Sequence, residues 1–245
     1  MIEAAGVGWR VGGARILEDI SLSVRPGELL GIIGPNGAGK SSLINILSGV
    51  LRPSSGRVVL GGHDVTRRSA TRRARMGLAR SFQTSALFDG LSARENVRLA
   101  LQATRPGSLN PVRTAASAPD GARADELLER VRMPWSGRVL AADLSHGDRR
   151  KLELAMALAS SPQVLLLDEP MAGVSADDVD GLTGIIGEVR DSGVAVAMVE
   201  HHMHVVLGLA DRVAVLHHGE LLAVGTADEV TGDERVQQAY LGEAL

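Results

Sequence analysis

Eight consecutive residues restrict the fold of this chain more than any other feature: Gly34-Pro35-Asn36-Gly37-Ala38-Gly39-Lys40-Ser41, followed by Ser42. They match the pattern G-x-x-x-x-G-K-[ST]. The apolar run Leu29–Ile33 before them predicts a buried strand, and Ser41–Ser48 after them has the apolar spacing of a helix. The sequence therefore predicts an α/β fold in which a strand, a glycine-rich loop and a helix follow one another.

This loop has the chemistry of a phosphate-binding site. Its glycines let the backbone N–H groups face phosphate oxygens, and the helix N-terminus adds favourable dipole charge. Lys40 is expected to neutralise the β- and γ-phosphates of a nucleotide, and Ser41 to bind Mg²⁺. The alternative is a glycine-rich turn with an incidental lysine, which the complete motif and its context disfavour. The expected phosphate-binding residues are Gly34, Pro35, Asn36, Gly37, Ala38, Gly39, Lys40, Ser41 and Ser42.

A second apolar run, Val164–Leu167, leads directly into Asp168-Glu169. Beside a phosphate-binding loop, Asp168 is expected to hold Mg²⁺ and Glu169 to polarise the attacking water as a general base. Taken alone, the pair would be a strand end with solvated charges. A further strand is expected at Val194–Val199, and strands that alternate with helices indicate a mainly parallel sheet with its ligand at the carboxyl ends.

The remaining elements are expected at five places. Ile16–Val24 alternates as a half-buried strand does, and Arg57–Val65 has the pattern of a small hairpin. Residues 102–123 contain three prolines and two glycines and predict a surface loop. Helices are expected at Ala124–Val131 and Arg149–Ala159.

Composition narrows the classes of function. The formal net charge of -3 argues against nucleic acid as the main partner, and the absence of cysteine excludes disulfides and thiolate-bound metals. No apolar stretch approaches the roughly 18–20 residues that span a bilayer, and the first residues lack the pattern of a signal peptide. A cytoplasmic chain is expected.

Leu144-Ser145-His146-Gly147-Asp148, before the helix at 149–159, resembles the LSGGQ signature of ABC ATPases, with histidine and aspartate at two variable positions. The resemblance implies that Ser145 and Gly147 contact the γ-phosphate held by an opposite subunit. Ser145 is equally suited to cap the helix, and the two roles do not compete.

Further motifs match the same family in order and spacing. Gln83 resembles the glutamine that senses Mg²⁺ and the attacking water, which implies a catalytic and a metal-binding role. Met171–Asp177 occupies the D-loop position, with Ser175 where many relatives have aspartate, and His201 resembles the switch histidine that holds the γ-phosphate and orders Glu169. The catalytic set implied is therefore Glu169, His201 and Gln83, with Ser41, Gln83 and Asp168 at the metal.

The resemblance covers essentially the whole chain and implies a fold. It is a P-loop NTPase core of ABC type, with an antiparallel β subdomain and an inserted α-helical subdomain. The chain is then a single nucleotide-binding domain, 1–245, with its core at about 1–80 and 160–245 and the helical subdomain at about 84–159. ATP and Mg²⁺ are implied as cofactors.

Within the family, four stretches resemble ATPases of importers for branched-chain amino acids and related amides. They are Gly77–Thr84, Leu152–Ala155, Val199–Met203 and Ala239–Glu243, while Leu144–Gly147 leans towards the urea or short-chain amide branch. The partners implied are a second ABC ATPase subunit, the same or homologous, two transmembrane permease subunits, with Leu87 and Phe88 as a docking point, and indirectly an extracytoplasmic solute-binding protein. The chain would lie on the inner face of the cell membrane. The alternative is a soluble ABC ATPase that remodels a macromolecular assembly.

Three local features have two interpretations each. Relatives carry an adenine-stacking aromatic where Val11 stands, so Trp9 either replaces it or simply packs. The arginines at 67, 68, 72, 73 and 75 form either a solvated helix face or a contact with anionic lipid or a permease. His201, His202 and His204 suggest a metal site, but they lack a further ligand at coordinating spacing.

Overall fold

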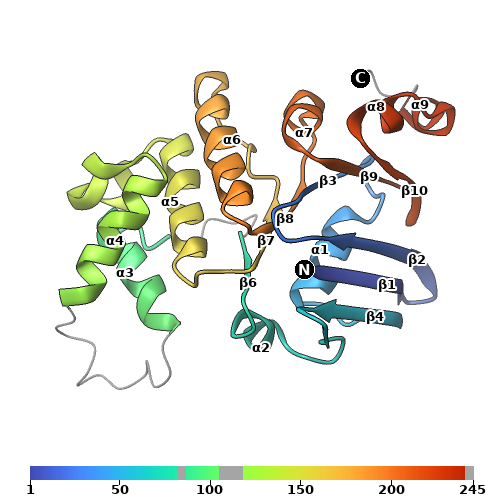
Figure 1. Cartoon of the computed structure of the whole chain (residues 1–245), viewed down its shortest axis with the longest axis horizontal. Coiled ribbons are helices and arrows are strands. Elements are labelled where there is room, and N and C mark those ends of the chain that lie inside the picture. Colours follow the sequence, from blue (N-terminus) through green and yellow to red (C-terminus); the bar gives the residue numbers. More distant parts are fainter. Residues whose placement is uncertain (82–86, 105–117, 241–245) are drawn as a thin grey trace. The chain divides into compact units, whose positions relative to one another are not determined.

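The computed structural model describes residues 1–81, 87–104 and 118–240. The chain divides into two compact units, drawn in Figure 1. Unit 1 consists of Met1–Arg80, Gln163–Pro170 and Val189–Leu245, and unit 2 of Ser81–Pro162 and Met171–Glu188. Unit 2 therefore contains Met171–Glu188 in addition to the helical subdomain expected at 84–159.

Unit 1 contains a six-stranded sheet in the order β10-β9-β3-β8-β7-β6. Its strands are parallel except β10, which pairs antiparallel with β9. Every residue of β3, β7 and β8 is buried, which explains their continuous apolar sequences. The strands are β3 (Leu29–Ile33), β6 (Leu78–Arg80), β7 (Val164–Asp168), β8 (Ala195–Val199), β9 (Arg212–His217) and β10 (Glu220–Gly225). The predicted α/β fold with a mainly parallel sheet is confirmed.

A second, antiparallel sheet in unit 1 has the order β2-β1-β4-β5. The predicted hairpin at 57–65 corresponds to β4 and β5, which pair through Val59 with Asp64 and Leu60 with His63. The strands are β1 (Ile2–Val11), β2 (Ala14–Val24), β4 (Ser55–Leu60) and β5 (His63–Asp64). The antiparallel β subdomain is confirmed as well.

Helix α1 (Lys40–Ser48) is fixed by the main core of unit 1. Its Leu43, Ile44, Ile46 and Leu47 are fully buried in one cluster with side chains from both sheets. Burying four such side chains contributes about 1.5–3 kcal/mol each before the entropy cost. The loop that precedes α1 is therefore attached to a rigid helix at one end and to β3 at the other.

The other end of α1 is capped by a buried cation. Arg73 lies in the short helix α2 (Ala70–Ala74) and is fully buried. Its Nη1 donates to the carbonyls of Ile46 at 2.6 Å and Leu47 at 2.7 Å, in the last turn of α1. Burial lowers the pKa of Arg73 to about 10, which leaves it charged at neutral pH. The interpretation of a solvated arginine face is therefore wrong for this position.

Unit 2 is built from helices. Helix α4 begins at Ala118, six residues before the predicted start, and Pro119 stands in its first turn, where a missing N–H breaks no intrahelical bond. The remainder of the expected loop, 105–117, lies outside the described residues. The helices are α3 (Ala93–Ala103), α4 (Ala118–Arg130), α5 (His146–Leu158) and most of α6 (Ala176–Asp191), with 3₁₀ turns at Pro134–Arg138 and Ala141–Asp143.

Three further helices complete unit 1: α7 (Met203–Leu209), α8 (Ala227–Thr231) and α9 (Glu234–Tyr240). A search of the described residues found no helix with the length and apolar character that crossing a bilayer requires.

Candidate functional site

The strand order of the larger sheet brings four chain segments together at its carboxyl edge. Strands β3, β8, β7 and β6 are successive neighbours and run in the same direction. The glycine-rich loop follows β3, Glu200-His201 follows β8, Glu169 follows β7, and Arg80 ends β6. Sites in parallel sheets lie at this edge, where the loops leave the strands.

The glycine-rich loop adopts a backbone that requires glycine at two places. Gly34 has φ 154°, and a Cβ there would lie 2.1 Å from the carbonyl oxygen of Leu216. Gly39, the N-cap of α1, has φ 101°, and its Cβ would lie 2.6 Å from Leu17 Cδ2. A side chain at position 34 would clash with backbone, and position 39 has a φ that favours glycine, so both ends of the motif require this residue.

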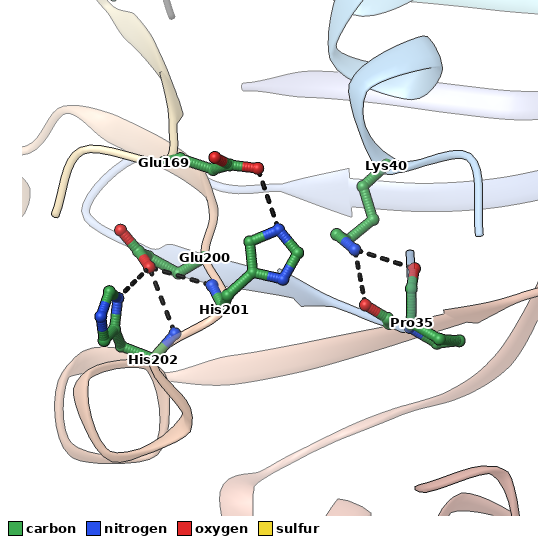
Figure 2. A network of polar contacts seen from close by, with 7 residues as sticks. Pro35, Lys40, Glu169, Glu200, His201 and His202 are labelled. Carbon is green, nitrogen blue, oxygen red and sulfur yellow. Dashed lines mark hydrogen bonds and ion pairs between the residues drawn. The ribbon is translucent and has the colours of Figure 1, made fainter. Parts of the chain in front are cut away.

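Lys40 points back along this loop. Its Nζ donates to the carbonyl of Gly34 at 2.5 Å and to that of Pro35 at 3.0 Å, and only 6% of the residue is exposed (Figure 2). Lysine fills only two of the 26 Lys and Arg positions, so the compact ammonium of Lys40 stands in a chain whose basic residues are mostly arginine. Within the described structure no side chain caps α1, so its first N–H groups face outward from the helix end. The combination suits an anionic phosphate.

The two described residues that are expected to bind Mg²⁺ both offer oxygen ligands. Ser41, exposed at the first turn of α1, offers a hydroxyl, and Asp168, buried at the end of β7, offers a carboxylate. Hard oxygen ligands of this type fit Mg²⁺. Asp168 is also held by Arg80, whose Nη2 lies 2.9 Å from Oδ2.

Glu169 and His201 form a direct pair. Their Oε1 and Nε2 atoms lie 2.9 Å apart (Figure 2). Since an ionised carboxylate only accepts, the ring donates its Nε2–H in this pair. Glu169 has φ 51°, a left-handed conformation that is uncommon for a non-glycine residue, and its N–H donates to the carbonyl of Val199 at 2.9 Å. A strained backbone that holds an acidic side chain is typical of functional sites.

Two functional candidates at this edge were missed by sequence reasoning. Arg80 directly precedes the Ser81-Phe82-Gln83 stretch, but nothing in the sequence around it indicates that its side chain pairs with Asp168. Glu200 is 2% exposed and accepts from the backbone of His201 and His202. The available signal for Glu200 was its position, since an acidic residue between an apolar strand and a histidine is rarely buried without partners.

Unit 2 contains the signature stretch at the start of α5. Ser145 is the N-cap: its Oγ accepts from the N–H of Asp148 at 3.1 Å and donates to Oδ2 of Asp148 at 2.8 Å. A Cβ on Gly147 would lie 2.7 Å from the carboxylate of Asp178, so any larger residue there would have to displace that side chain. The aspartate at position 148 thus engages the hydroxyl of the signature serine and pairs with Lys151 at 3.1 Å.

The other expected site residues have separate outcomes. Trp9 is half-buried against the core of unit 1, whereas Val11 is 51% exposed. These exposures do not test stacking of Trp9 on adenine, which stays a prediction. Gln83 lies outside the described residues. Ser175 donates to Asp178 at 2.8 Å within unit 2. His201 and His202 bond to carboxylates, and a search of the described ranges found no cluster of three potential metal ligands among His, Asp and Glu.

Comparison with known families gives two matches. The sequence profile described as "ABC transporter" matches residues 17–172, more than half of the chain. The profile described as "Branched-chain amino acid ATP-binding cassette transporter" matches residues 220–245.

Curated relatives and a solved structure agree with these matches. The lipopolysaccharide export ATP-binding protein LptB of Escherichia coli K12 is 35% identical over 94% of this chain and 92% of its own. The branched-chain amino acid transport ATP-binding protein LivG of Salmonella typhimurium LT2 is 34% identical over 100% of this chain and 98% of its own. A nucleotide-free ATP-binding cassette from an ABC transporter superposes with a TM-score of 0.89 at 27% identity, covering 99% of both chains. These three are transporter subunits, so a macromolecule-remodelling ATPase gains no support from them.

Proposed function

The chain belongs to the ATP-binding subunits of ABC transporters, which couple ATP hydrolysis to transport, and from that premise we propose that it drives an importer for branched-chain amino acids or related amides. The proposed class of solute is supported by the match of residues 220–245 to the branched-chain amino acid profile. This segment lies outside the phosphate-binding machinery, and its match supports the branched-chain amino acid branch of the family.

The proposed chemistry uses the residues at the carboxyl edge of the six-stranded sheet. The loop from Gly34 to Ser42 binds the phosphates of ATP, with Lys40 released from its loop carbonyls to the β- and γ-phosphates. Ser41 and Asp168 hold Mg²⁺, which neutralises phosphate charge when bound. Glu169 takes a proton from the attacking water, and His201 orients Glu169 through the 2.9 Å bond. Gln83 is proposed to contact the metal and this water.

Two copies of the machinery are required by the proposal. Ser145 and Gly147 belong to unit 2 and are proposed to contact the γ-phosphate bound to Lys40 of another subunit, the same chain or a homologous one. The bond between the Ser145 hydroxyl and Asp148 holds that hydroxyl at the start of α5. ATP then closes the dimer, and hydrolysis reopens it.

The permease is proposed to dock on exposed apolar side chains of unit 2. Phe88 is 54% exposed, and Trp135 is 59% exposed. The loop at Phe88 is held by the fully buried Asn96, which accepts from its N–H at 2.8 Å and donates to its carbonyl at 3.1 Å. A fixed, exposed aromatic is suited to bind a partner. Docking would keep the chain on the inner face of the cell membrane, and the permease would connect it to an extracytoplasmic solute-binding protein.

One relative favours a second cargo. LptB is named as part of a lipopolysaccharide export system and is as similar to this chain as LivG is. The name of the C-terminal profile supports the amino-acid branch, and the equal likeness to LptB supports an export cargo as the second candidate. The solute therefore has to be identified by experiment.

The proposal is tested by purifying the subunit from its native membranes, identifying the proteins that accompany it, and measuring ATP hydrolysis of the complex with candidate solutes. Two multi-span permeases and stimulation by branched-chain amino acids or amides are expected. Stimulation by a lipid cargo alone would replace the importer by an exporter. Phe88→Ser should reduce recovery of the permeases, whereas Val50→Ser, at an apolar residue of unit 1 that is 56% exposed, should not.

A further inference from the structure

A buried carboxylate lies directly before His201 and bonds to its backbone. Glu200 follows β8 and is 2% exposed, a degree of burial that acidic side chains rarely reach. We infer that Glu200 is a positioning residue for hydrolysis: it fixes the backbone of His201 and His202 so that the His201 ring meets Glu169. This inference rests on the proposed role of His201.

One oxygen of Glu200 collects three donors, as Figure 2 shows. Oε2 accepts from the backbone N–H of His201 at 2.9 Å, from that of His202 at 3.3 Å, and from His202 Nδ1 at 3.0 Å. Bonds to an ionised acceptor are about twice as strong as neutral ones. The carboxylate therefore constrains two consecutive peptide units through its own side chain.

This constraint acts where packing is weak. The side chain of His201 is 44% exposed and that of His202 is 49% exposed, so few neighbours restrict them. The side chain of Glu200 is only 1% exposed and sits rigidly at the end of β8. The bonds of Glu200 thus fix the backbone of the two residues that follow it, His201 and His202, whose side chains are exposed.

The partner of His201 depends on the same strand end. The N–H of Glu169 donates to the carbonyl of Val199, the last residue of β8. Glu169 is therefore fixed to β8 by its backbone, and His201 is fixed to β8 through Glu200. The 2.9 Å contact between them needs both connections, and a displacement of about 1 Å can cost about 100-fold in rate.

A purely structural carboxylate would give a different pattern of effects. If Glu200 only stabilised the fold, its removal would lower stability and would slow hydrolysis independently of His201. If Glu200 acts through His201, removing it has no further effect once the imidazole is gone, because the two effects are not additive.

The test measures ATP hydrolysis by the purified full chain for Glu200→Ala, Glu200→Gln, His201→Ala and the double variant Glu200→Ala/His201→Ala. We expect kcat of Glu200→Ala to fall about 10-fold or more with KM for ATP nearly unchanged, since only orientation is lost. Glu200→Gln retains an acceptor oxygen and should recover part of the rate. His201→Ala should lose about 100-fold, and the double variant should be no slower. The matched control is Glu220→Gln, at the exposed first residue of β10.

A second readout does not depend on activity. Hydrogen exchange at the His201 amide of the nucleotide-free chain should accelerate in Glu200→Ala and stay unchanged in Glu220→Gln. Normal kcat in both Glu200 variants, or an additional loss in the double variant, would overturn the inference while leaving the role of His201 intact. Normal kcat in His201→Ala would overturn that role first, so the two failures are distinguishable.

Discussion

Arg80 and Asp168 join the ends of two neighbouring strands by an ion pair in which Nη2 lies 2.9 Å from Oδ2. The side chains are 11% and 1% exposed. The same guanidinium donates from Nη1 to Asn45 Oδ1 at 2.6 Å and to Ser48 Oγ at 3.0 Å, both on α1. One cation thus ties the helix that begins with Lys40 to the carboxylate proposed to hold Mg²⁺.

Arg80→Ala is expected to destabilise the nucleotide-free chain by about 3–5 kcal/mol, because it leaves a buried carboxylate without its paired charge. Urea unfolding measures the change. The control is Arg15→Ala, whose ion pair with Glu18 is 59% and 43% exposed and is worth at most about 1 kcal/mol. Equal losses in the two variants would contradict the importance of burial at Arg80.

Arg73→Ala should also unfold more easily, by about 3 kcal/mol or more. The carbonyls of Ile46 and Leu47 lose their charged donor, and a cavity remains where a fully buried side chain stood. Arg72→Ala, at an exposed neighbour on the same helix, should change stability by less than about 0.5 kcal/mol. Thermal unfolding of both variants measures the two stability losses, and equal losses would contradict the role of burial at Arg73.

Much of the fold could be predicted because its signals are local. Strand β3 matches its predicted range residue for residue, and β7 and β8 begin and end within one residue of theirs. Runs that are apolar at every position require burial on both faces, which a parallel sheet supplies. The site followed from the fold, because Glu169 and His201 stand at the ends of such runs and neighbouring strands bring them to 2.9 Å.

The remainder depended on contacts between residues far apart in sequence. Arg73 resembled the exposed arginines beside it, and only the position of α1 shows why it is buried. The helix at 118–130 began within a stretch rich in proline and glycine, where composition suggested a loop. Asp148, in the signature stretch, accepts a hydrogen bond from the Ser145 hydroxyl, and the spacing of the two residues in the sequence does not predict this bond.

Lys40→Ala is expected to weaken binding of ATP by about 10- to 100-fold, the effect of losing a charged donor to phosphate. The control is Lys151→Ala, the only other lysine, which pairs with Asp148 and Asp178 in unit 2. Titration calorimetry with the isolated chain measures both affinities. Normal affinity in Lys40→Ala would count against the phosphate-loop assignment.

Glu169→Gln should bind ATP normally and hydrolyse it at least about 100-fold more slowly, since the amide cannot accept a proton from water. The amide keeps the shape of the side chain and can still bond to His201, so the change isolates the base. Single-turnover hydrolysis with radiolabelled ATP measures the chemical step. Unchanged turnover would remove Glu169 as the general base.

The backbone at Glu169 gives a separate prediction that concerns stability alone. With φ 51°, the residue occupies a left-handed conformation that costs a side chain about 1–2 kcal/mol and glycine almost nothing. Glu169→Ala and Glu169→Gly both remove the carboxylate and its bond to His201, so their difference reports the backbone. Glu169→Gly should be the more stable by about 1 kcal/mol in urea unfolding, the reverse of the order expected in a helix or strand. If the alanine variant were the more stable, the strain would not be located at this residue.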